Sequence, residues 1–158
     1  SRTCAYTNHT ILAEALEKWP IHYLKKVVPQ LMPIIEVLDE PIKDNPSNQD
    51  IELVKNKEGK KVLKYLKNND YLISLDLDKK QFKSEEFARY LEDKFIQGKS
   101  TINFVIGGSY GLSDELKSRA NDSISLSKMT FLHQMTRLIL LEQIYRAFKI
   151  NKHETYHK

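Results

Sequence analysis

Residues 104–111 read Phe104-Val105-Ile106-Gly107-Gly108-Ser109-Tyr110-Gly111, an apolar run that passes directly into clustered glycines. Three of the five glycines in the chain fall in this stretch. Because glycine has no Cβ atom, a turn built from it can adopt positive φ values and lie close to a ligand. A tight turn without a ligand explains these glycines about equally well. The stretch therefore predicts a buried strand that ends in a turn, and other signals must decide whether the turn binds anything.

Short apolar runs alternate with helical patterns on both sides of this stretch. We expect strands at residues 34–38, 71–77 and 102–106. We expect helices at residues 50–67 and 84–97, and two more that begin at Ser113 and Thr130. Strands that alternate with long helices favour a parallel sheet covered on both faces. The predicted fold class is therefore α/β, with a mostly parallel sheet and helices on both faces, in one domain that spans residues 1–158.

The helix at residues 84–97 has clear predicted ends. Ser84 is a favourable N-cap residue, and Glu85 and Glu86 in the first turn complement the helix dipole. We expect Gly98 to end the helix. Its expected buried side chains are Phe87, Leu91 and Phe95. In the helix at residues 50–67, the expected buried stripe is Ile51, Val54, Val62 and Leu66.

The N-terminal region differs in composition from the rest of the chain. All five prolines lie at or before residue 46, and all five glycines follow it. We predict two short helices within residues 10–31, because Pro20 interrupts the helical pattern and Pro29 closes it. An edge strand at residues 7–13 is the alternative.

Three segments follow predicted strands at their carboxyl ends, namely residues 75–78, 107–111 and 126–131. In open α/β sheets, ligands bind beyond these ends. The glycine cluster lacks the G-x-G-x-x-G spacing of dinucleotide-binding folds, and no Gly-Lys-Ser/Thr follows it as in a phosphate-binding loop. Nucleotide phosphates are therefore poorly supported as ligands.

Ser123, Ser125 and Ser127 alternate with Ile124 and Leu126. This alternation fits a half-exposed strand. It equally fits a segment whose amides and hydroxyls line a pocket while the apolar residues anchor it to the core.

Apolar residues recur three or four positions apart in the last helix, which indicates a wide apolar face. They are Met135, Leu138, Leu141, Ile144, Tyr145 and Phe148. Such a face packs on the sheet, on a second subunit, or on both.

The excess positive charge of the chain, +4, lies entirely in residues 128–158. That segment contains six Lys or Arg against two Glu, whereas residues 1–127 balance at nineteen against nineteen. A local basic region suits a polyanion such as nucleic acid. The alternative is an ordinary solvated helix face.

The single cysteine, Cys4, cannot form an internal disulfide and provides no zinc set, so no metal is expected. The sequence has no apolar run of the roughly 20 residues that a membrane span needs, and no secretory signal. We expect a cytoplasmic protein without a membrane partner.

Several motifs together carry a family resemblance. They are residues 104–109, residues 125–131, His133-Gln134-Met135, residues 142–148 and the final Tyr156-His157-Lys158. In order and spacing these motifs resemble the RlmH family, small methyltransferases of the SPOUT superfamily. The similarity runs from about residue 34 to residue 158, roughly four fifths of the chain.

The resemblance implies a C-terminal trefoil knot, a homodimer and S-adenosylmethionine as cofactor. It implies methyl transfer to N3 of a pseudouridine in large-subunit (23S) ribosomal RNA, with the ribosome or its RNA as partner. The cofactor-binding residues implied for this chain are Leu75, Gly107, Leu126, Ser127, Lys128, Met129, Thr130 and Phe131. The implied catalytic residues are Arg146, Tyr156 and His157.

The chemistry of the implied catalytic residues agrees with these roles. The acceptor nitrogen carries a weakly acidic imide proton, so a cation such as Arg146 can stabilise the developing anion and a base such as His157 can remove the proton. A flexible aromatic and basic tail also suits an unpaired RNA base. As alternatives, Arg146 forms a surface pair with Glu142, and Tyr156 and His157 form a frayed end.

The chain also departs from the family pattern. Residues 1–33 lack the usual Val-Gly-Lys and contain no glycine, Leu132 replaces a common proline, and Lys79 stands where a turn glycine is usual. A second hypothesis is therefore a catalytically silent homodimeric module that binds ribosomes or RNA.

Overall fold

The computed structural model describes residues 4–6, 34–36, 40–99, 101–108, 110–131 and 133–157. In these ranges a five-stranded sheet has the order β2-β1-β4-β3-β5. Its strands are β1 (Cys4–Tyr6), β2 (Ile34–Glu36), β3 (Tyr71–Gln81), β4 (Ile102–Ile106) and β5 (Asp122–Ser125). β3 lies between β4 and β5 and is parallel to both, whereas β1 is antiparallel to β2 and to β4. The α/β class is confirmed, with a parallel part of three strands.

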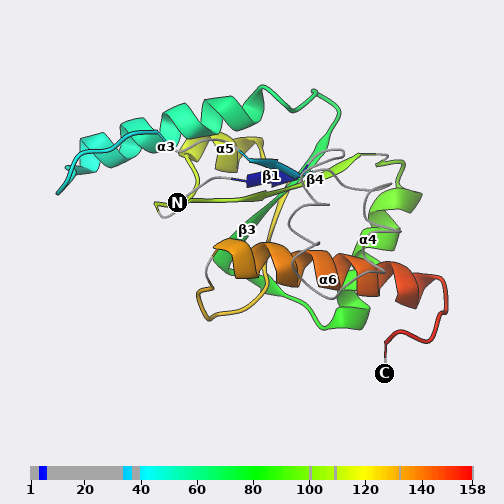
Figure 1. The fold of residues 1–158 in the computed structure, drawn as a ribbon. Helices are drawn as coiled ribbons and strands as arrows, with labels where there is room; N and C mark the ends of the chain where they lie inside the picture. The colour runs from blue at the N-terminus through cyan, green and yellow to red at the C-terminus, as the bar shows by residue number, and fades with distance from the viewer. Residues whose placement is uncertain are drawn as a thin grey trace.

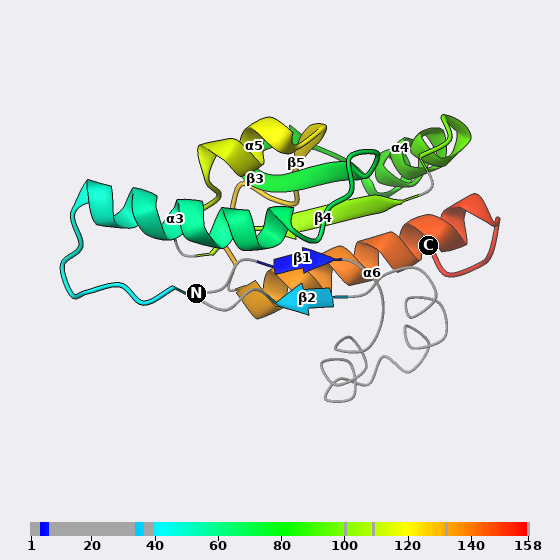
Figure 2. The same cartoon turned by 90° about the horizontal axis from the view of Figure 1, so that it is seen from above.

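The helices lie on both faces of the sheet, as predicted (Figures 1 and 2). They are α3 (Asn48–Leu63), α4 (Ser84–Ile96), α5 (Asp114–Arg119) and α6 (His133–Asn151). In β4, Phe104 and Ile106 belong to the core cluster formed with α4 and α6, and Val105 belongs to the cluster formed with α3 and α5. Because successive side chains of a strand point to opposite faces, a fully apolar strand of this kind needs cover on both sides.

The sequence at the start of α3 explains where this helix begins. The Ser47 hydroxyl accepts a hydrogen bond from the Asp50 amide at 3.1 Å, and the Ser47 amide donates to the Asp50 carboxylate at 2.9 Å. This reciprocal pair satisfies amide groups that have no partner within the helix. Val54 and Val62 of α3 are buried, as predicted. The helix ends at Leu63, four residues before the predicted end.

Predictions for the N-terminal region are only partly tested. The strand predicted at residues 34–38 is confirmed over β2. The two helices predicted within residues 10–31, and the alternative edge strand at residues 7–13, lie outside the described residues.

Two predictions for α4 were wrong. Its N-cap residue is Lys83, and Ser84 is the first helical residue, because the Ser84 hydroxyl instead donates a 2.8 Å hydrogen bond to Gln143 of α6. Phe95 is 42% exposed, since it lies in the last turn of α4, where it contacts the ring of Phe148 and leaves its other side to solvent. The predicted end at Gly98 is confirmed by the left-handed conformation of this glycine, with a φ of 84°.

β3 continues past its predicted end, to Gln81, with an interruption. Ile124 of β5 is paired with Leu75 and again with Lys80, so residues 76–79 of β3 leave the ladder as an excursion. This excursion lies at the carboxyl edge of the parallel strands, where β4 passes into the glycine turn. It therefore adds side chains to the edge at which ligands bind in α/β folds.

Every helix in the described ranges is too short or too polar to cross a membrane.

Candidate functional site

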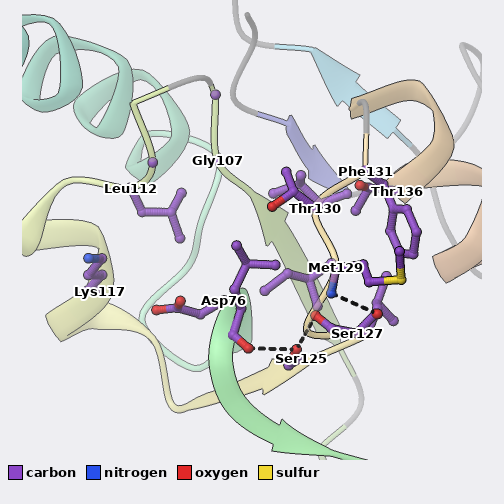
Figure 3. Close-up of a pocket in the computed structure, with 16 residues that line it drawn as sticks. Asp76, Gly107, Leu112, Lys117, Ser125, Ser127, Met129, Thr130, Phe131 and Thr136 are labelled. Carbon is purple, nitrogen blue, oxygen red and sulfur yellow. Dashed lines mark hydrogen bonds between the residues drawn. The ribbon is translucent and has the colours of Figure 1, made fainter.

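A cavity of about 630 Å³ lies at the carboxyl ends of β3, β4 and β5 (Figure 3). Its walls come from the end of β3 and its excursion, the glycine turn after β4, and residues 125–131 after β5. Lys117 of α5 and Thr136 of α6 complete the lining. Cofactor pockets in proteins commonly have volumes of about 300–1,000 Å³. The three segments expected at these strand ends therefore meet around a space of the size a cofactor needs.

The glycine turn is tight because its two ends touch. The Gly111 amide donates a 3.0 Å hydrogen bond to the Gly108 carbonyl. A Cβ atom added at Gly107 would lie 3.0 Å from the backbone carbonyl carbon of Gly111 and 3.2 Å from its Cα. Backbone atoms cannot give way as a flexible side chain would, so this wall of the pocket requires glycine at position 107.

Ser125 holds the other two walls together. Its hydroxyl, which is buried, lies 3.1 Å from the Leu77 carbonyl in the excursion and 2.9 Å from the Ser127 carbonyl. The Ser127 hydroxyl in turn accepts a 3.0 Å hydrogen bond from the Met129 amide. Both interpretations of the alternating serines are therefore partly correct. Ser123 pairs with the Ser74 hydroxyl within the sheet, whereas Ser125 and Ser127 line the pocket.

Most of the residues implied as cofactor-binding line this pocket. They are Leu75, Gly107, Leu126, Ser127, Met129, Thr130 and Phe131. Lys128 is exposed and does not line it. Sequence reasoning did not single out Asp76, Lys117 or Thr136 as lining residues. Asp76 directly follows Leu75 at a strand end, which was a usable signal, but nothing local marks Lys117 or Thr136.

The three implied catalytic residues form a second group at the far end of α6. Arg146 forms an ion pair of 2.5 Å with Glu142, and its guanidinium lies 4.9 Å from the centroid of the Tyr156 ring. Arg146 Nη1 lies 3.1 Å from His157 Nδ1. The Tyr156 hydroxyl donates to Glu142 at 3.2 Å, and its ring meets that of Tyr145 edge-on. We call Arg146, Tyr156 and His157 the tail cluster.

The contacts of the tail cluster show how these residues are placed, whereas their catalytic role stays a prediction. The predicted pair of Arg146 with Glu142 exists, but Arg146 also contacts both tail residues. Tyr156 and His157 are partly buried and hydrogen-bonded, so they are not a frayed end.

The hydrogen bonds of His157 define its tautomer. A guanidinium has only donors, so Nδ1 accepts from Arg146. Nε2 then carries the proton and donates to the Glu85 carboxylate at 2.7 Å. This hydrogen bond from His157 is the main cause that holds the pKa of Glu85 below its usual value.

The tail cluster and the pocket are well separated within one chain. Thr136 lines the pocket near the start of α6, and Arg146 follows ten residues later in the same helix. At a rise of 1.5 Å per residue, this places them about 15 Å apart along the helix axis. The structure therefore gathers the implied catalytic residues with one another but not with the pocket.

Among the described residues, no group of three or more His, Cys, Asp or Glu side chains could hold a metal ion. The site thus combines a cofactor-sized cavity with a separate cluster of a cation, an imidazole and a phenol.

An α/β fold with three parallel strands and a glycine-walled pocket at their carboxyl ends agrees with what comparison with known proteins finds. Residues 8–157 match the family described as "Predicted SPOUT methyltransferase", so the chain belongs to the SPOUT methyltransferases.

Its relatives include proteins named "Ribosomal RNA large subunit methyltransferase H". Those of Clostridium acetobutylicum, Clostridioides difficile and Clostridium novyi are 50%, 53% and 54% identical to this chain over 125 residues, which is 79% of each chain. The resemblance to the RlmH family is therefore confirmed, and the protein is a methyltransferase.

Proposed function

We propose that this protein transfers a methyl group from S-adenosylmethionine to N3 of a pseudouridine in the RNA of the large ribosomal subunit. The observation that carries the proposal is the pocket at the strand ends, which is lined by nearly all of the residues expected to bind the cofactor. The names of the relatives support ribosomal RNA of the large subunit as the substrate.

The pocket suits the proposed cofactor in shape and chemistry. Leu126 and Phe131 offer apolar surface to a flat adenine ring, and Ser127 and Thr130 offer hydroxyl groups. The absence of a side chain at Gly107 lets the glycine turn close against Gly111, which shapes this wall of the cavity. When bound, S-adenosylmethionine would supply an electrophilic methyl group. The work of the lining residues is then to hold it in line with the acceptor and to exclude water.

The tail cluster would act on the acceptor base. The Arg146 guanidinium would stabilise negative charge that develops as the imide loses its proton. His157 would accept that proton at Nδ1, once this atom exchanges its hydrogen bond with Arg146 for one with the substrate. Tyr156 would add an aromatic ring beside the Arg146 guanidinium, a combination that suits an unpaired RNA base.

The separation of pocket and tail cluster supports a homodimer as the active unit. Reacting atoms must approach to about 3–3.5 Å. Because Arg146 lies within α6, it cannot reach the pocket of its own chain unless the whole helix moves. A second subunit would bring its tail cluster to the pocket of the first. Leu77, Met129 and Met135 near the pocket are 44%, 72% and 41% exposed, and they offer apolar surface for a partner.

We also propose that the C-terminal part of the chain forms the trefoil knot expected of the family. Supporting this proposal, β5 pairs with β3 rather than with the preceding strand β4, and residues 126–131 then reach the same pocket as the glycine turn. A crystal structure traced from residue 102 to residue 151 would refute it if the chain did not thread through its own loop.

Calorimetric titration with S-adenosylmethionine tests the cofactor proposal. We expect saturable binding with a stoichiometry of one cofactor per chain. A folded protein that shows no saturable binding would contradict the cofactor proposal. In parallel, Arg146→Ala should reduce turnover far more than cofactor affinity, and equal losses in both would contradict the role given to Arg146.

A further inference from the structure

Among the residues that the structure describes, two charged residues line the pocket, and they have opposite signs. Asp76 comes from the excursion of β3, and Lys117 comes from α5. The other lining residues are apolar, glycine or hydroxyl-bearing. Figure 3 draws the two charged side chains on one side of the pocket and Met129 and Phe131 on the other. Both charges of the pocket therefore lie on the side away from Met129 and Phe131.

Both charged residues are carried by elements that are held in place. The excursion with Asp76 is tied to the loop after β5 through the bond between the Ser125 hydroxyl and the Leu77 carbonyl. Lys117 follows Leu116, which is fully buried, and its amide donates to the Ser113 carbonyl in the first turn of α5. The two charges thus start from fixed backbone positions on two different elements.

Neither charge is neutralised by a neighbour that the structure describes. Within the described ranges, the Asp76 carboxylate and the Lys117 ammonium form no ion pair with each other and no side-chain hydrogen bond. Asp76 is half-buried and Lys117 is exposed, so water solvates both charges and neither needs a partner in the protein. A ligand with one positive and one negative group could satisfy both.

We propose that Asp76 and Lys117 bind the amino-acid end of the cofactor, Asp76 its α-ammonium group and Lys117 its α-carboxylate. The inference rests on the proposed function, because it assumes S-adenosylmethionine in this pocket. The adenosine half of that molecule is uncharged and suits the side of the pocket with Met129 and Phe131. The amino-acid half is a zwitterion, whose two charges complement the two on the other side.

Three ligands distinguish binding of the amino-acid end by Asp76 and Lys117 from a general disturbance of the pocket by the substitutions. S-adenosylhomocysteine has the zwitterion without the sulfonium charge, its decarboxylated form keeps only the ammonium group, and 5′-methylthioadenosine has neither. Calorimetry would give the dissociation constants of all three for the wild type, Asp76→Asn and Lys117→Met. Asp78→Asn, in the same excursion, and Lys60→Met, on α3, are matched controls because both residues are exposed and lie outside the pocket lining.

We expect each pocket variant to bind S-adenosylhomocysteine at least about tenfold more weakly, which is the scale of a lost charge-assisted hydrogen bond. Both should bind 5′-methylthioadenosine within about twofold of the wild type, a result that also verifies that the pocket is folded. With the decarboxylated ligand, the effect of Lys117→Met should vanish and that of Asp76→Asn should remain. The controls should match the wild type for every ligand.

Equal losses for S-adenosylhomocysteine and 5′-methylthioadenosine would overturn the inference while leaving the proposed function standing. Unchanged affinity for all three ligands would overturn it as well, and Lys117 would then be free to contact RNA. If the wild type binds none of the ligands, the proposed function itself fails, and the inference fails with it.

Discussion

Arg146 and His157 are joined by a hydrogen bond of 3.1 Å between Nη1 and Nδ1. Because arginine can only donate, the lone pair of Nδ1 is occupied, and the proton on the ring sits on Nε2, next to Glu85. The arrangement fixes the tautomer that a general base at Nδ1 requires. It also means that His157 can accept a substrate proton only after Arg146 turns to another acceptor, such as the oxygen of an ionising base.

The hydrogen bond between His157 and Glu85 has a pH signature. The pKa of Glu85 is lowered, chiefly by this bond. A carboxyl group whose pKa falls on folding stabilises the fold above its unfolded pKa, about 4.3 for Glu, and loses this contribution as pH falls through the lowered value. We expect the Glu85 carboxylate to stay ionised, and so able to accept the hydrogen bond from His157, from neutral pH to below about pH 4.3.

Carboxyl-carbon NMR titration checks this expectation. The midpoint for Glu85 should lie below the usual value for a glutamate and should rise in His157→Ala. An unchanged Glu85 midpoint in that variant would mean that the bond does not form in solution.

Gly107→Ala should damage the pocket more than the fold. The new Cβ atom would meet the backbone of Gly111 at 3.0 Å, so the turn must shift, at a cost of about 1–3 kcal/mol in unfolding free energy. We expect cofactor affinity to fall at least tenfold, because the same shift displaces a pocket wall. Calorimetry and thermal unfolding measure the two effects.

Gly98→Ala is the matched control for this change. Gly98 has a positive φ, with no atom within 4 Å of an added Cβ, and it lies outside the pocket lining. It should lose about 1 kcal/mol of stability through backbone strain and keep its cofactor affinity. A Gly107→Ala protein with normal affinity would contradict the close approach described here.

The contact between α3 and α5 depends on a second glycine. A Cβ atom at Gly59 would lie 2.3 Å from the Ser113 hydroxyl oxygen, which caps α5 by accepting from the Leu116 amide at 3.2 Å. Alanine normally stabilises a helix interior over glycine by about 0.5–1 kcal/mol. Here we expect Gly59→Ala to destabilise by about 1–3 kcal/mol in urea unfolding, since overpacking outweighs the gain in propensity.

Ser113→Ala alone should cost about 1 kcal/mol through the lost cap. The double variant should be more stable than the sum of the two losses predicts, because removing the hydroxyl relieves the clash. Additive losses would show that the two residues do not meet.

Mixed dimers test whether two chains share one site. Gly107→Ala should disable the pocket and Arg146→Ala the tail cluster, so dimers of either variant alone should be nearly inactive. A dimer with one chain of each kind would retain one intact pocket facing one intact tail cluster. We expect methyl transfer at up to about half the wild-type rate in purified, differently tagged mixed dimers. Mixed dimers no more active than the two parents would refute a shared site.

The sequence alone predicts the structure correctly where neighbouring residues determine it. The run Phe104–Ile106 followed by Gly107 predicts a buried strand and a close turn, since a continuous apolar run and a missing Cβ act within a few residues. The tail motif implied roles for residues that the fold does gather around Arg146.

The sequence alone does not predict features of the structure that depend on contacts between residues far apart in the chain. The excursion of β3 exists because Ile124 pairs with both Leu75 and Lys80, and no property of residues 76–79 alone predicts that register shift. Ser84 has the chemistry of an N-cap, yet its hydroxyl is taken by Gln143, 59 residues away. Lys117 reaches the pocket only because α5 packs beside the glycine turn, so its position had no local signal.

Methyl transfer to pseudouridine is measured by incubating the protein with large ribosomal subunits or whole ribosomes and S-adenosylmethionine carrying a labelled methyl group. The RNA nucleosides are then analysed by mass spectrometry. We expect label in N3-methylpseudouridine of the large-subunit RNA, and none with Arg146→Ala. Saturable cofactor binding and salt-sensitive ribosome binding without any labelled pseudouridine would contradict it, and would leave a module that binds ribosomes but does not methylate them.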